Sequence, residues 1–295
     1  MTDKYSILTC VGTRTHQSSL EQRMGEAFAR HEELTKRLTL HVGDEERLFD
    51  RTRRCSQPTE LVVAPVELHR RNVQHRLRER NASKGAFAFD DPEGVSREIL
   101  KAADEPSKAI DRIDRLALVR SILPDLIKQE TDSFSLPPGV TSHDSHHVEQ
   151  IRTEVEAVTN FHPSRTEAWR CAADDLYAPI DAESEEILDL ALAVERGLHN
   201  QTGKATSETD LVRRATRTIV ASNGSAWTEA YPEIVRVTLL GLNSLSAPHA
   251  DLLHALLAAT SIDVHVHFRE GTGAYLESRV PALLDVEGPG QVVFE

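Results

Sequence analysis

The feature that most constrains the fold is a regular alternation of strand-like and helix-like segments between residues 37 and 105. The strand patterns lie at 37–42, 59–65 and 85–89, and each is followed by a helical pattern, at 44–54, 66–80 and 91–103. The run TELVVAP at 59–65 is almost continuously apolar, as in strands that are buried on both faces. Alternation of this kind predicts a parallel sheet with crossover helices.

From residue 106 to 205 the strand patterns stop. Four helical patterns fill this range, at 107–128, 144–161, 165–177 and 182–201. Strand and helix patterns then resume at 207–221 (helix), 233–242 (strand), 248–260 (helix) and 262–268 (strand). We therefore predict an N-terminal extension (1–36), an α/β domain in two parts (37–105 and 206–295) and a helical insertion (106–205).

Charge and composition limit the functions that this chain can have. The 295 residues include 34 basic and 47 acidic side chains, for a net charge of −13. That balance argues against a general nucleic-acid coat protein but leaves room for a local basic stripe. Only seven of the basic residues are lysines, and acidic, lysine-poor usage favours a halophilic archaeon, although a high-GC genome gives the same arginine bias.

Cysteine spacing and hydropathy indicate the compartment. Cys10, Cys55 and Cys171 lie far apart without CxxC spacing, which excludes a cysteine-rich zinc ribbon and gives no sign of a disulfide framework. No apolar run approaches the roughly 18 residues of a membrane helix, and no secretory segment follows the first methionine. We expect a soluble, cytoplasmic protein.

Two histidine-rich segments raise the possibility of a metal site. In IDVHVHF, alternation along a strand puts Asp263, His265 and His267 on one face, as in some metal-dependent hydrolases. Such hydrolases take further ligands from later strands, and few residues follow here, so a strand with a polar face is the favoured interpretation. The second segment, 143–149, contains three histidines, an aspartate and a glutamate but no HExxH motif. We expect no metal and no cofactor, with a metal-dependent hydrolase as the alternative.

A helix with several arginines follows the second strand. In VELHRRNVQHRLRER, the arginines at 70, 71, 76, 78 and 80 could meet phosphates, and binding would then be strongly salt-dependent. A solvated helix whose C-terminal arginines complement the helix dipole is the simpler interpretation.

The order of these segments resembles the first helicase-like domain of UvrD-type enzymes, most closely the AddB-like subunits of helicase–nuclease complexes in recombinational repair. The phrases that carry the resemblance are LTLHVGDEERLFD (38–50), ELVVAPVELHRRNVQHRL (60–77) and VRVTLLGLNSLSAPHADLLHALLAA (235–259). The resemblance implies a P-loop-NTPase-like (RecA-like) parallel sheet with helices on both faces and a helical insertion.

The chain departs from this family at both catalytic motifs. Gly43 is followed by Asp44, Glu45 and another glutamate where active relatives have Gly-Lys-Ser/Thr, so the lysine and hydroxyl that meet phosphates and magnesium are missing. The run Gly241-Leu242-Asn243 replaces the acidic pair that would hold magnesium. We therefore predict a vestigial nucleotide loop, retained because the sheet needs its central strand, and no ATP hydrolysis.

The resemblance implies a non-catalytic scaffold or a DNA-handling subunit, working with a separate helicase or nuclease subunit and in some settings with single-stranded DNA. Ligands of open parallel sheets bind at the carboxyl ends of the strands. We therefore predict the contact surface at Pro65, His69, Arg70, Arg71 and Arg76. The turn at 90–91 is added to this surface, although its two aspartates weaken it for phosphates. A truncated, non-functional remnant is a further alternative.

Overall fold

The computed structural model describes residues 37–42, 46–52, 58–82, 85–129, 136–141, 143–242 and 244–269. The predicted N-terminal extension and the vestigial loop at Gly43, Asp44 and Glu45 lie outside these ranges.

The described residues form one sheet of five parallel strands, which confirms the predicted parallel sheet. The strands are β1 (Leu38–Val42), β2 (Glu60–Val63), β3 (Ala88–Asp90), β4 (Arg236–Leu242) and β5 (Asp263–Phe268). Their order is β1-β5-β4-β2-β3. The first strand was expected at the centre, and this was wrong for the sheet as described. β5 inserts between β1 and β4, so β1 is the outermost of the described strands on that side.

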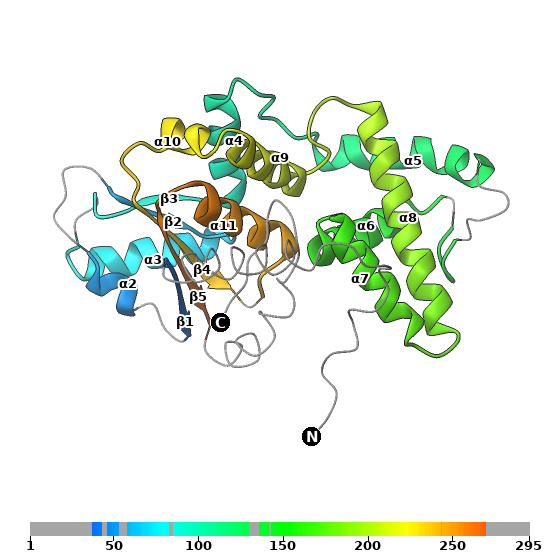
Figure 1. Ribbon diagram of the computed structural model, residues 1–295, viewed down its shortest axis with the longest axis horizontal. Coiled ribbons are helices and arrows are strands. Elements are labelled where there is room, and N and C mark those ends of the chain that lie inside the picture. The colour runs from blue at the N-terminus through cyan, green and yellow to red at the C-terminus, as the bar shows by residue number, and fades with distance from the viewer. Residues whose placement is uncertain are drawn as a thin grey trace, which may run out of the picture.

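Helices cover both faces of the sheet (Figure 1). The face that we call the apolar face packs against α4 (Pro92–Ala102), α9 (Glu208–Ala221), α10 (Ser225–Ala230) and α11 (Ala247–Ala259). The opposite face, which we call the mixed face, packs against α2 (Glu46–Asp50) and α3 (Glu67–Glu79) through Val62 and Leu240. Because side chains alternate along a strand, the polar side chains of β1, β4 and β5 also lie on the mixed face.

Local sequence signals explain where several helices begin. The Asp91 carboxylate accepts a hydrogen bond from the Gly94 amide at 2.8 Å, and Pro92 occupies the first turn of α4, as the sequence predicts. Ser207 caps α9 in the same way, accepting from the Asp210 amide at 2.9 Å. The short helix α10 was not predicted.

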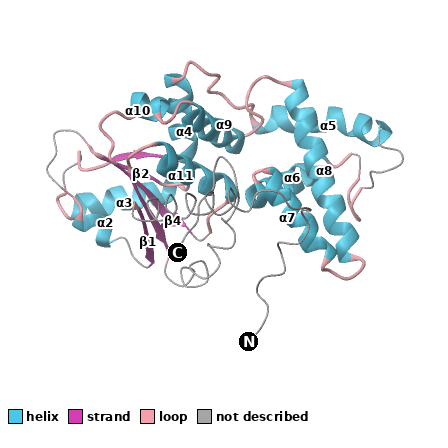
Figure 2. Cartoon of the chain, viewed as in Figure 1, coloured by secondary structure: helices cyan, strands magenta, loops and turns pink. Residues whose placement is uncertain are grey.

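The range 112–201 contains helices and, among its described residues, no strand (Figure 2). These helices are α5 (Arg112–Gln129), α6 (Ser145–Thr159), α7 (Pro163–Asp174) and α8 (Ile180–Gln201), which confirms the four helical patterns. Whether they form a separate domain stays a prediction. No helix in the described ranges has both the length and the apolar character needed to cross a membrane.

Buried ion pairs join these helices to the rest of the molecule. Arg165, which lies on α7, binds the carboxylate of Asp251 on α11, and one of the two bonds measures 2.9 Å. The Asn160 side chain, at the end of α6, donates to the same carboxylate at 2.6 Å. All three side chains are buried, so this contact lies in the interior between the helical segment and α11.

Candidate functional site

The predicted contact residues lie at the carboxyl ends of β2 and β3 and along α3. Pro65 is exposed directly after β2, and Arg70 on the first turns of α3 approaches Asp91 after β3, with 3.4 Å between Nη1 and Oδ2. Arg71 pairs with Glu67 one turn earlier on the same helix. Arg76 lies over the ring of Phe49. The three arginines are thus already engaged within the chain, and a phosphate would have to displace these contacts.

The fifth predicted residue, His69, packs against Gly241 at the end of β4. Gly241 has a φ of +74°, and a Cβ placed on it would lie 2.5 Å from Cδ2 of His69. The pairing of β4 with β5 is irregular between Leu239 and Leu242, which accommodates this backbone. A side chain of any kind at residue 241 would therefore meet both left-handed backbone strain and the imidazole ring. Asn243 lies outside the described residues.

A pocket of about 360 Å³ opens at the edge of the sheet where the strands have their carboxyl ends. Its charged lining residues are all carboxylates, Glu67, Asp91, Glu93 and Glu208, and among the described lining residues there is no lysine or arginine. Burial raises the pKa of the neighbouring Asp90. This pocket favours a cationic or neutral group over a phosphate.

His249 also lines this edge pocket. Its Nδ1 lies 3.0 Å from the hydroxyl of Ser246, at the start of α11. Burial lowers the pKa of His249 to about 4, so the ring is neutral near pH 7.

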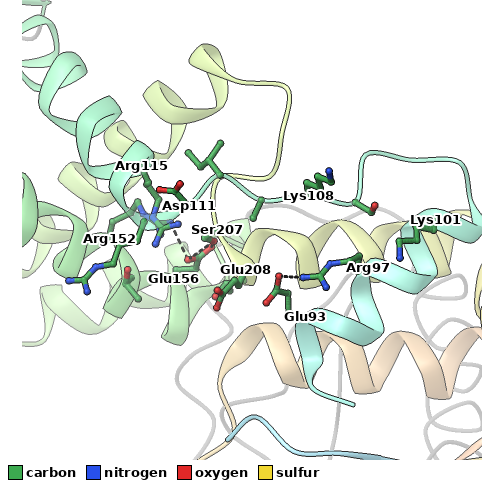
Figure 3. A pocket seen from close by; sticks show the side chains of 16 residues that line it. Glu93, Arg97, Lys101, Lys108, Asp111, Arg115, Arg152, Glu156, Ser207 and Glu208 are labelled. Carbon is green, nitrogen blue, oxygen red and sulfur yellow. Dashed lines mark hydrogen bonds and ion pairs between the residues drawn. The ribbon is translucent and has the colours of Figure 1, made fainter. Parts of the chain in front are cut away.

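A larger pocket, of about 790 Å³, lies between α4, α9 and the first helices of the 112–201 segment. Figure 3 shows Arg97 and Lys101 on one side of it, Arg115 and Arg152 on the other, and Lys108 on the connecting loop above. Six cationic and four acidic side chains line it, a positive balance in a chain whose net charge is −13.

Most of the cations around the larger pocket already have partners. Arg97 pairs with Glu93, and Lys101 pairs with Glu98 at 2.6 Å. Lys108 and Arg112 are exposed and make no ion pair within the described part of the chain. These two side chains are the cations of the pocket that a phosphodiester could reach without displacing a partner.

The wall of the larger pocket is a buried ion-pair network that the sequence patterns did not reveal. Arg152 is 1% exposed and binds Glu149 at 2.8 Å, Glu156 at 3.1 Å and Glu195 at 2.8 Å. Arg213, on α9, approaches Glu156 at 3.3 Å and also binds Glu195. The network therefore links α6 and α8 to α9.

Opposing effects set the charge of the buried carboxylates in this network. Burial by itself would raise the pKa of Glu195. A hydrogen bond with His199 and the charges of Arg213 and Arg152 outweigh burial and bring that pKa down to about 2. Burial also disfavours the charged form of Arg152, but the surrounding carboxylates raise its pKa. Both groups are therefore charged at neutral pH.

The strand IDVHVHF places His265 and His267 on one face, as predicted, and the fold adds a third histidine. His41 on β1 is the register partner of His267 on β5, and the two rings stack with centroids 4.1 Å apart. His41 Nε2 lies 2.9 Å from His265 Nδ1. Burial, aided by the charges of Arg51 and Arg236, lowers the pKa of His265 to about 4.

The second histidine segment does not join this cluster. Among the described residues, none of the groups with ligand atoms close enough to share a metal ion includes His143, His146 or His147. His146 and His147 instead line a separate pocket, together with two arginines and three carboxylates. The structure therefore does not assemble the predicted alternative of a hydrolase that uses both segments. His41 could not have been selected from sequence, because only the strand register places it beside β5.

Comparison with known proteins gives one finding. The sequence model of a family described as "Halobacterial UvrD-like protein" matches residues 24–295. No curated protein matches the chain.

Proposed function

This chain belongs to the halobacterial UvrD-like protein family, and we propose that it is a non-catalytic, helicase-like scaffold or DNA-handling subunit in recombinational DNA repair. In this proposal the sheet is an inactivated RecA-like domain of the AddB-like kind, located in the cytoplasm. Its main partner is a separately encoded helicase or nuclease subunit, and single-stranded DNA is a second ligand.

The observation that best supports the lack of ATP turnover is the backbone conformation at the end of β4. The resemblance to UvrD-type enzymes puts the magnesium-binding acidic pair at residues 241–243. At 241 the left-handed backbone and the His69 ring leave no space for a carboxylate-bearing side chain. Without a carboxylate there, the site lacks a ligand that would hold magnesium against the β- and γ-phosphates.

The sheet supports a RecA-like assignment. All five described strands run parallel, so their carboxyl ends meet at one side of the sheet. Ligands of open α/β sheets bind at that edge. The described residues at that edge carry ion pairs and exposed apolar side chains.

Exposed apolar side chains after β2 favour a protein partner at this edge. Val66 and Leu68 are 52% and 67% exposed and lie next to the exposed Pro65. Contiguous exposed apolar side chains are a feature of surfaces that another protein covers. A phosphate backbone would gain little here, because Arg70 and Arg71 are paired with carboxylates.

A pull-down of the tagged full-length chain from a halobacterial host tests the scaffold function. We expect a helicase or nuclease chain to be recovered, and to remain after nuclease treatment. Leu68→Glu should weaken its recovery, because a charge replaces a contact at the proposed surface. Val235→Glu is the matched control: Val235 is 59% exposed but precedes β4, at the opposite edge of the sheet. An empty pull-down with folded protein would refute the scaffold, and equal recovery with both variants would refute this surface.

Fluorescence anisotropy with a labelled single-stranded oligonucleotide tests the DNA contact. We propose that the single-stranded DNA contacts Lys108 and Arg112. The double charge reversal at these positions should weaken binding and lower the dependence of log K on log salt by about one unit or more. Lys204→Glu, at another exposed lysine, should leave both unchanged. Loss of binding only on reversal of Arg70 and Arg71 would move the contact to α3.

A further inference from the structure

Three imidazoles meet on the mixed face of the sheet, outside the three pockets described above. They come from two neighbouring parallel strands, His41 from β1 and His265 and His267 from β5. One ligand nitrogen of each lies within 4.8 Å of those of the other two. His41 and His267 are only 8% and 2% exposed, and His265 is half-buried.

We propose that His41, His265 and His267 bind one divalent transition-metal ion, with zinc the best match to three nitrogen ligands. Neutral imidazole is a common ligand of zinc, at about 2.0–2.1 Å in tetrahedral sites. The site is independent of the proposed scaffold function.

Charged side chains of both signs lie near the cluster. Along the mixed face, Arg51 binds Glu60 at 2.9 Å. Arg236 approaches Asp263 at 3.3 Å and Glu60 at 3.6 Å. At His265 the charges of the two arginines outweigh that of Glu60, so the local charge opposes a dication. Coordination by the three neutral nitrogens would supply the binding energy.

A second cluster in the molecule shows what a filled site looks like. Glu195, His199 and Asp210 also bring three ligand atoms within 4.8 Å of one another. There the guanidinium of Arg213 already binds both carboxylates, and its Nη2 lies 3.0 Å from Oδ1 of Asp210. The guanidinium thus takes the place that a metal ion would have. The three-histidine cluster differs in composition, because all of its ligand atoms are imidazole nitrogens.

Coordination requires the three side chains to rotate. The three rings are stacked, with interplanar angles of 22° and 23° between His41 and the other two, so their in-plane lone pairs do not yet converge. Rotation of the side chains about χ1 and χ2 would direct the nitrogens at a common point. The cluster contains three ligands among the described residues, which leaves the fourth position to water or another small ligand.

The position of the cluster suggests what the ion does. β1 pairs only with β5 among the described strands, and an ion shared by His41 and His267 would cross-link these two strands. Binding to the folded chain alone would raise thermal stability in a concentration-dependent way. The ion would thus fix the edge strand that leads to the vestigial loop.

Cobalt is the probe for the test. Full-length protein is freed of metal with a chelator and titrated with Co²⁺, whose visible absorption reports tetrahedral nitrogen coordination, and then with competing Zn²⁺. We expect about one equivalent bound, displaced by zinc, together with a rise in the melting temperature. His41→Asn and His267→Asn should each lose the absorption and the rise. His146→Asn and His147→Asn, at exposed histidines of the other segment, should keep both.

If His267→Asn does not fold, His265→Asn at the half-buried member replaces it. Absence of binding to the folded wild-type chain would overturn the proposal. Binding that persists in folded variants of the three histidines would also overturn it.

Discussion

Replacement of Arg152 by methionine tests whether the buried network joins the helical segment to the α/β layers. The Arg152 side chain is 1% exposed and binds the carboxylates of Glu149, Glu156 and Glu195. Methionine keeps most of the volume but leaves buried negative charge without its main partner. Removal of one partner of a buried ion pair costs about 3–5 kcal/mol.

Two remaining arginines limit this estimate. Arg115 still binds Glu149, and Arg213 still binds Glu195 and lies 3.3 Å from Glu156. We therefore expect the free energy of unfolding to fall by about 3–5 kcal/mol and not by a multiple of it. Since the whole stability of a domain is about 5–15 kcal/mol, this is a large fraction.

Arg170→Met is the matched control. Arg170 pairs with Asp189 at 2.9 Å, within the same helical segment, but the two side chains are 40% and 49% exposed. An exposed pair contributes about 0.2–1 kcal/mol. The two variants thus remove the same type of bond and differ mainly in burial.

Urea denaturation followed by tryptophan fluorescence is a suitable assay, because the two tryptophans report different parts of the molecule. Trp169 lies on α7, and Trp227 is buried on α10. With Trp169→Phe and Trp227→Phe backgrounds, each half can be followed alone. We expect both reporters to show one transition in the wild type and a lower midpoint in Arg152→Met. A loss below about 1 kcal/mol, equal to that of Arg170→Met, would refute the reasoning.

Two further predictions concern the carboxyl edge of the sheet. Gly241→Ala should destabilise the fold by about 1–2 kcal/mol of backbone strain, plus about 1–3 kcal/mol of overlap with His69. In thermal unfolding, the added change His69→Ala should recover the second part only, and no recovery would exclude the contact. For His249, whose pKa falls from 6.5 to about 4 on folding, the unfolded chain takes up a proton first as the pH drops. Stability should therefore be retained above pH 6.5 and fall by up to about 3 kcal/mol towards pH 4. A folded His249→Asn variant with the same pH dependence would contradict this assignment.

The sequence by itself determined the elements and the type of sheet. Local periodicity and capping residues act over a few positions, so the strand TELVVAP, the cap at Asp91 and the four helices between 112 and 201 could be predicted. The pairing of His265 with His267 on one face follows from the two-residue repeat of a strand. The missing Gly-Lys-Ser/Thr was equally visible, because it is a local motif.

Only the tertiary structure decided which distant residues meet. The strand order β1-β5-β4-β2-β3 puts His41 beside His267. In this order β1 is an outermost strand among those described, whereas the sequence had led us to expect it at the centre. Packing of α6 and α8 against α9 brings Arg152 to Glu195, and packing of α3 on the sheet sets its histidine against Gly241. These contacts join residues that are far apart in the chain, and no periodicity encodes them. Strand register and helix docking arise from burial of the whole core, so the histidine cluster and the ion-pair network exist only in the folded molecule.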